Sequence, residues 1–270
     1  MANIRAEETF PQDLLVLQRE QEQFVSRNKY MVAECFSKYG KLNFISLICE
    51  IIFLVLLLGV GLSLTFLGFE KTFNIVVVSI LVIFFVFWFV VSGLMLMERR
   101  EFRNINKYFK IAWGHEKKAI AANIAEGVID AVSDSTASDI FSLILSIISL
   151  IHYYQNLEFL AAGYNKELRD ANLKTFYGKT FSIGFLLNTL LSLAWIITIT
   201  IYQVVTYYNM ENYYNIKITN TEVARVTGIA CLISASFLLG CFLIDYFLGK
   251  RIYIRSGNEY SKYIRKAKVE

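Results

Sequence analysis

The sequence predicts an all-α, polytopic membrane protein with four transmembrane helices, arranged as two hairpins, above a helical cytoplasmic layer. Hydrophobic residues make up 56% of the 270 residues, and the mean hydropathy is +0.46. Soluble domains of this length are about half apolar or less. Four long runs are almost free of charge, the chain has one proline, and no stretch alternates polar and apolar residues as a strand does.

Each of the four runs is long enough for a helix to cross a bilayer, which takes roughly 20 apolar residues. The expected spans lie at about residues 43–68, 73–97, 180–204 and 226–249. Two charged side chains lie inside them, Glu50 in the first span and Asp245 in the fourth. The first 41 residues are polar, so the first span is expected to be an uncleaved anchor.

A fifth uncharged stretch, residues 140–157, carries a polar stripe of Ser142, Ser146, Ser149 and His152. With four spans, 24 Lys and Arg lie on one side of the membrane against 3 on the other, whereas a fifth span gives 15 against 12. Basic residues favour the cytoplasmic side. The four-span arrangement therefore predicts a multi-pass protein with cytoplasmic amino and carboxyl termini. Residues 140–157 would then lie on the inner leaflet, pack under the bundle or re-enter the membrane.

The chain resembles a duplication. Tyr39-Gly40-Lys41 precedes the first span and Tyr177-Gly178-Lys179 precedes the third, while basic motifs at 107–112 and 262–267 follow the second and fourth. This divides the chain into a first helix–hairpin–helix unit at 1–112, a helical insert at 113–160 and a second unit at 161–270. Positive-inside bias alone could also place basic residues at these ends. The two units would share one orientation, as in a parallel repeat.

Residues 11–38 predict a helix that begins at Pro11 and has an apolar seam at spacings of three and four residues. Polar residues interrupt the seam, a feature that fixes register or partner number in coiled coils. Packing within the chain and assembly between chains both remain open. The seam comprises Leu14, Leu17, Gln21, Phe24, Asn28, Met31 and Cys35.

Charges inside spans are the first candidates for function, because burying a carboxylate in the bilayer costs about 2.5–3.5 kcal/mol on insertion scales. Glu50 could line a pore, carry protons or simply orient the spans. The repeat offset places Asn188 at the equivalent depth of the third span, where the two side chains could face each other. Asp245 is expected to form an interfacial ion pair with Lys250 or Arg251.

Other chemistry lacks the necessary residue patterns. The two histidines, His115 and His152, have no Cys or carboxylate at ligand spacing, so no metal and no cofactor is expected. No phosphate-binding loop, dinucleotide fingerprint or nucleophile elbow occurs, and an enzyme is not expected. The net charge of +4 arises from basic residues beside apolar runs, which indicates a membrane surface and not nucleic acid as the partner.

The arrangement of a polar helix, two spans and a basic helix resembles the SLATT effector domains of prokaryotic conflict systems, here in duplicated form. The likeness is carried by residues 26–30, 37–41, 98–104 and 107–108 in the first unit, and by 165–179, 250–251 and 262–263 in the second. It implies a protein of the bacterial inner membrane that assembles as a homo-oligomer and permeabilises the bilayer when a cytosolic sensor or regulator is triggered.

Three functions follow as hypotheses. The first is a pore-forming or membrane-disrupting effector with Glu50 and Asn188 near the conduction path. The second is a constitutive ion channel or small-solute transporter subunit, although few inward charges are available for a proton relay. The third is a non-conducting scaffold whose cytoplasmic helices dock a soluble partner.

Overall fold

The computed structural model describes residues 12–67, 71–132, 136–176, 178–212 and 220–267, and every regular element among them is helical. The all-α prediction is therefore confirmed. The elements are α1 (Gln12–Leu67), α2 (Lys71–Phe102), α3 (Lys107–Val132), α4 (Thr136–Asp170), α5 (Thr180–Asn212), α6 (Asn220–Asp245), a π-helical turn η1 (Tyr246–Lys250) and α7 (Arg251–Ala267).

Helix α1 runs without a break through both the predicted seam and the first predicted span. It has 56 residues and no internal proline, so nothing in its sequence interrupts the backbone hydrogen bonds. At 1.5 Å per residue it is about 84 Å long. Among the seam residues, the side chains of Leu14, Leu17, Gln21, Phe24 and Asn28 lie outside the described ones, and the side chain of Met31 is exposed. An assembly role for the seam stays a prediction.

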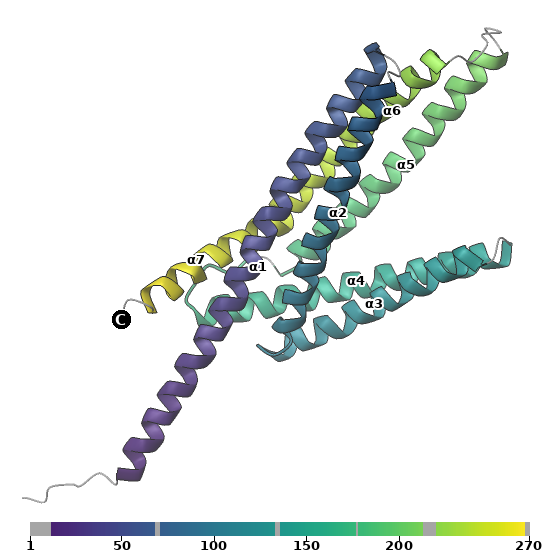
Figure 1. Ribbon diagram of the computed structural model, residues 1–270. Coiled ribbons are helices and arrows are strands. Elements are labelled where there is room, and N and C mark those ends of the chain that lie inside the picture. The colour runs from purple at the N-terminus through teal and green to yellow at the C-terminus, as the bar shows by residue number, and fades with distance from the viewer. Residues whose placement is uncertain (1–11, 68–70, 133–135, 177, 213–219, 268–270) are drawn as a thin grey trace, which may run out of the picture.

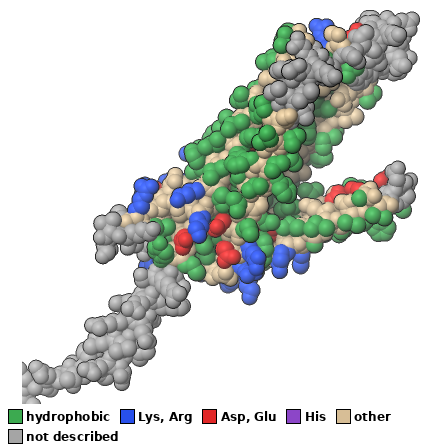
Figure 2. Space-filling model, viewed as in Figure 1, with side chains coloured by type: hydrophobic (Ala, Val, Ile, Leu, Met, Phe, Trp, Pro, Cys, Tyr) green, Lys and Arg blue, Asp and Glu red, His purple; other side chains and the backbone are tan. Residues whose placement is uncertain are grey.

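Among the described residues, five helical segments are long and apolar enough to cross a membrane, and they lie in α1, α2, α4, α5 and the continuous α6–α7 rod. The long antiparallel pair of α1 and α6 is at the centre, with α2 packed on α1 and α5 packed on α6 (Figure 1). Among the described residues there is no extended packing between α2 and α5. The space-filling view shows hydrophobic side chains along the rods and charged side chains gathered near their base (Figure 2).

Two glycine pairs let α1 approach the α6–α7 rod closely. Gly40 lies against Gly257, where an added Cβ would come within 2.7 Å of the opposite Cα. Gly61 lies against Gly228, where an added Cβ would meet the Thr65 nitrogen at 2.6 Å and the Gly61 carbonyl oxygen at 2.8 Å. Small residues at such crossings allow backbone contact, the usual way in which helices associate in lipid.

Replacing Gly228 by Ala is expected to destabilise the α1–α6 contact by about 1–3 kcal/mol, because backbone atoms and not a flexible side-chain end would have to move. Gly59→Ala is the matched control on α1, since nothing lies within 4 Å of that position. Thermal unfolding in detergent, followed by circular dichroism, compares the two variants. Equal stability of G228A and G59A would contradict the close contact.

The buried core lies at the base, where six helices meet. Eight aromatic side chains pack there with ring centroids as close as 4.6 Å, the distance between Phe36 and Tyr164. Edge-on and tilted ring pairs of this kind contribute beyond the area they bury. The cluster joins α1, α2, α3, α4, α5 and α7 into one unit. Its aromatic members are Phe36, Tyr39, Phe102, Phe109, Tyr164, Phe181, Tyr253 and Tyr260.

Asparagine side chains fix the two connections next to this core. Asn106 accepts hydrogen bonds from the backbone nitrogens of Tyr108 and Phe109, which caps α3, and it donates to Glu167 of α4 at 2.7 Å. Asn165 forms a pair of hydrogen bonds with the backbone of Phe176 in the connection between α4 and α5. Helix α4 ends at Asp170, and Asn172, two residues later, has a left-handed φ of 55°.

The expected insert at 113–160 is part of a long antiparallel hairpin formed by α3 and α4, which leaves the base to one side (Figure 1). The predicted serine stripe of residues 140–157 faces α3. Ser142 donates to Asp130, Ser146 donates to Glu126, and Ser149 donates to the carbonyl of Ala119. The stripe is thus the helix–helix contact of this hairpin.

The two proposed repeat units fold differently at their ends. In the first unit the polar helix and the predicted span are one helix, α1, whereas in the second α4 ends at Asp170 and α5 begins at Thr180. Conversely, a turn separates α2 from α3, whereas the fourth span continues through η1 into α7. The duplication stays a prediction about the sequence.

Candidate functional site

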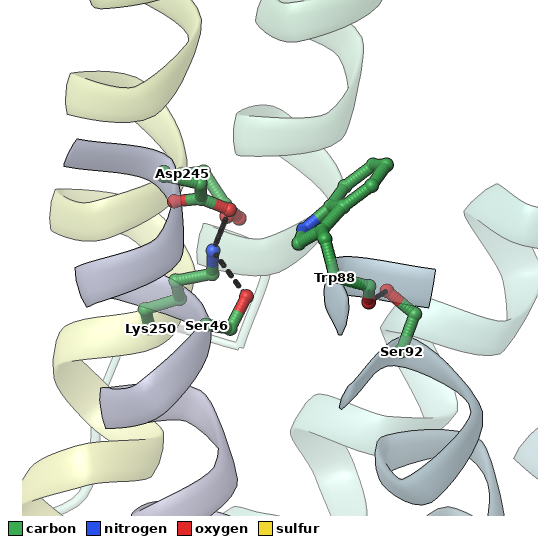
Figure 3. Close-up of polar contacts among 6 residues, drawn as sticks. Ser46, Trp88, Ser92, Asp245 and Lys250 are labelled. Atoms are coloured by element: carbon green, nitrogen blue, oxygen red, sulfur yellow. Dashed lines mark hydrogen bonds and ion pairs between the residues drawn. The ribbon is translucent and has the colours of Figure 1, made fainter. Parts of the chain in front are cut away.

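A buried ion cluster lies where the central pair of helices approaches the base. The Lys250 ammonium donates to the Glu50 carboxylate and to the Ser46 hydroxyl at 3.1 Å, both on α1, and forms an ion pair with Asp245 at 3.2 Å (Figure 3). Lys250 and Glu50 are 5% and 8% exposed, whereas the Asp245 side chain is 42% exposed. One buried ammonium therefore faces two carboxylates.

The π-helical turn explains how Asp245 and Lys250 meet. Five residues apart on a regular α-helix, two side chains point about 140° away from each other. In the π-helical turn from Tyr246 to Lys250, the backbone hydrogen bonds join residues five apart instead of four. One turn of this helix therefore contains more residues than a turn of α-helix. The ion pair between Asp245 and Lys250 that the sequence suggested is thus present, and it depends on this local change of helix type.

No hydrogen bond joins Asn188 to Glu50 among the described residues, and a shared role for the two stays a prediction. Asn188 lines a cavity of about 240 Å³ together with Asp245 and Arg99, and the cavity is otherwise walled by apolar and aromatic side chains. The Glu50 carboxylate turns to Lys250 because a full charge attracts the ammonium far more strongly than an amide dipole does. Asp245, which both lines the cavity and pairs with Lys250, links the three predicted residues.

Two buried polar atoms of this region have no hydrogen-bond partner among the described residues. They are Oε2 of Glu50 and Oδ1 of Asn188. Buried acceptors are normally satisfied, and an unsatisfied one indicates strain, a functional role or an unseen water or ion. Both atoms can accept hydrogen bonds from water or coordinate a cation.

A second ion pair closes the base of the same cavity. Arg99 of α2 donates to the Tyr39 hydroxyl at 2.6 Å and to Glu116 of α3 at 2.9 Å. Glu116 is 4% exposed, and Arg99 also lines the cavity with Asn188. The sequence showed Arg99 only as one of two adjacent basic residues. Arg99 turns inward, whereas Arg100 is exposed.

The two histidines, distant in the sequence, meet in the α3–α4 hairpin. Their Nδ1 atoms are 3.2 Å apart, and the His115 ring stacks on Phe159. Partial burial, His152 and Lys118 lower the pKa of His115. Within the residues that the structure describes, no group of three His, Cys, Asp or Glu side chains could hold a metal ion.

Sequence reasoning singled out Glu50, Asn188 and Asp245 but gave Lys250 only a surface role. The sequence indicated Lys250 as one of two possible partners of Asp245, but it held no signal for the contact of Lys250 with Glu50, 200 positions away. For Arg99 and Glu116 no local pattern distinguished them from surface charges. Together these residues form the candidate site, a charged cluster and an adjoining cavity between the helices that could span the membrane.

These features define an all-helical protein with several helices capable of crossing a membrane. Comparisons with protein-family models, curated proteins and solved structures find no match to the chain.

Proposed function

We propose that the chain is a subunit of a homo-oligomeric effector of the bacterial inner membrane, which forms a cation-permeable pore when a cytosolic sensor or regulator triggers it. In this proposal α1, α2, α5 and α6 cross the bilayer, and both termini are cytoplasmic. The distribution of 24 basic residues against 3 supports this topology. The resemblance to SLATT effector domains supports the effector role.

The observation that carries the proposal is the ion cluster of Glu50, Lys250 and Asp245, with Glu50 inside the first proposed span and the other two at the cytoplasmic end of the fourth. Ionisable groups in or against a span are costly and usually mark an ion pathway. Two carboxylates share one ammonium, so the cluster has an excess of negative charge. Glu50 Oε2 and Asn188 Oδ1 are open acceptors beside it. These are ligands for a partly hydrated cation, not for an anion.

The open arrangement of the spans supports assembly. The cavity beside the ion cluster is bounded by α2, α4, α5 and the α6–α7 rod, but α2 and α5 do not pack along each other. One chain therefore does not enclose a continuous conduit. The outer faces of α2 and α5 remain exposed and apolar, as in Phe89 at 71% and Ile197 at 58%. Several copies in a ring could together form the wall of a conduit, with these apolar faces against lipid or against one another.

The test uses the purified full chain in vesicles filled with a potential-sensitive dye under a potassium gradient, alongside induced expression with a membrane-potential dye. We expect depolarisation in cells only when the regulator is triggered, and cation flux in vesicles from the chains that assemble there. We expect Glu50→Gln to shift the reversal potential of that flux toward zero because it removes negative charge. Glu34→Gln is the matched control on α1, where the carboxylate pairs with Lys38 at the surface. It should leave selectivity unchanged.

Other results would assign another function. Flux that needs no trigger in cells would indicate a constitutive channel or transporter subunit. An unchanged membrane potential under every trigger, with no flux in vesicles, would indicate a scaffold. Flux with equal selectivity in the wild type, E50Q and E34Q would remove the ion cluster from the conduction path.

A further inference from the structure

In the outer half of the α3–α4 hairpin the serine side chains of α4 lie inside, whereas apolar side chains form one outer edge. Between residues 140 and 151 of α4 the three serines face α3, and two of them are buried. The apolar residues of the same segment point outward, eight of them at 40–61% exposure. They are Ile140, Phe141, Leu143, Ile144, Ile147, Ile148, Leu150 and Ile151.

The outer half of α3 continues this surface. Ile124, Val128 and Val132 are 63%, 57% and 81% exposed, while Ala119 and Ala122 are buried against α4. The carboxylates of Glu126 and Asp130 accept hydrogen bonds from the α4 serines. A soluble protein rarely leaves an apolar surface of this extent in water. Hydrogen-bonded serines inside and aliphatic groups outside suit this edge of the hairpin to hydrocarbon, whereas the exposed Asp130 and Asp139 suit the other edge to water.

The charge pattern also separates this segment from the rest of the protein. Residues 119–165 contain no Lys or Arg, over 47 consecutive positions. Entry of the hairpin tip into the membrane from the cytoplasmic side therefore leaves the distribution of 24 basic residues against 3 unchanged. The first basic residues outside it, Lys117 and Lys118, are exposed on α3, where they would lie on the aqueous side of the headgroups. Positive charge favours that boundary.

The dimensions agree with partial entry. Residues 119–132 of α3 extend about 21 Å, whereas a full crossing needs about 30 Å of hydrocarbon.

The hairpin diverges from the spans at the base, whereas the amino-terminal part of α1 extends away from the bundle in the opposite direction (Figure 1). In the space-filling view the exposed hydrophobic side chains follow one edge of the hairpin, and acidic ones follow the other near its free end (Figure 2).

We infer that the α3–α4 hairpin, over residues 119–132 and 136–152, is a re-entrant element whose apolar edge is covered by the acyl chains of the cytoplasmic leaflet. Its partner is the lipid bilayer, and not a second copy of the chain or a soluble protein. The inference rests on the proposed membrane topology and does not require that the protein conducts ions.

The experiment places single cysteines in the full chain after Cys35, Cys49, Cys231 and Cys241 are replaced by Ala, and labels each with an environment-sensitive fluorophore. Ile144→Cys reports on the outer surface of the hairpin, with Ile151→Cys as a second position if the first fails to fold. Lys118→Cys is the control expected in water. Phe89→Cys, exposed on α2, is the control expected in lipid. The proteins are reconstituted in phosphatidylcholine vesicles containing a fraction of acyl-chain spin-labelled phosphatidylcholine.

We expect the label at Ile144 to emit at shorter wavelength than the label at Lys118 and to be quenched by the spin-labelled lipid as the label at Phe89 is. Emission and quenching like those at Lys118 would overturn the inference in favour of water. A blue-shifted label that the lipid does not quench would overturn it in favour of a protein partner. Quenching at Phe89 shows that the protein is inserted. Failure of the proposed pore would appear as absent flux in the same vesicles with the quenching unchanged.

Discussion

Replacement of Lys250 by Met is expected to destabilise the protein by about 3–5 kcal/mol, because it leaves buried carboxylate charge without its cation. Lys250 is 5% exposed and is the ion-pair partner of both Glu50 and Asp245. At roughly 2–4 °C per kcal/mol for a chain of this size, the melting temperature should fall by roughly 10 °C. Thermal unfolding in detergent measures this change.

Lys262→Met is the matched control for this substitution. Lys262 lies on α7, its side chain is 67% exposed, and its pair with Glu259 is a surface contact worth less than about 1 kcal/mol. The triple variant Glu50→Gln, Asp245→Asn, Lys250→Met should regain much of the lost stability, because no charge is then left unpaired. If K250M were as stable as K262M, the buried cluster would not exist as described.

Replacement of Arg99 by Met is expected to destabilise the base of the molecule by about 3 kcal/mol, because Glu116 is left buried without a cation. The substitution also removes the donor to the Tyr39 hydroxyl, so α1, α2 and α3 lose their shared polar contact. The neighbouring Arg100 is exposed, and Arg100→Met should change the stability by less than about 0.5 kcal/mol.

A double-mutant cycle separates the ion pair from the packing of the arginine side chain. Glu116→Gln combined with Arg99→Met should be less destabilising than the sum of the two single changes, with a coupling of about 0.5–3 kcal/mol. Additive effects would show that Arg99 acts through its aliphatic stem alone. Limited proteolysis of the α3–α4 hairpin provides a second readout, since the Arg99–Glu116 contact joins α3 to α2.

Some of the candidate site could be predicted because it depends on local patterns. A charge in a long apolar run is visible in the sequence, and this identified Glu50 and Asp245. The neighbours of these residues were harder to predict. Glu50 pairs with Lys250, which lies 200 positions away, and not with Asn188 of the corresponding span. A repeat offset gives equal depth in the bilayer, but it does not say which helices are adjacent.

The sequence alone determined the helical class, the apolar segments and the polar stripe of α4, because hydrophobic runs and helical periodicity are properties of neighbouring residues. Only the tertiary structure decided that α1 pairs with the α6–α7 rod, that Arg99 turns inward while Arg100 stays in solvent, and that the α4 serines face α3. The physical reason is that contacts between helices depend on backbone approach at Gly61 and Gly228 and on the aromatic packing of six helices at the base. The glycine contacts and the aromatic packing both join residues that lie far apart in the sequence.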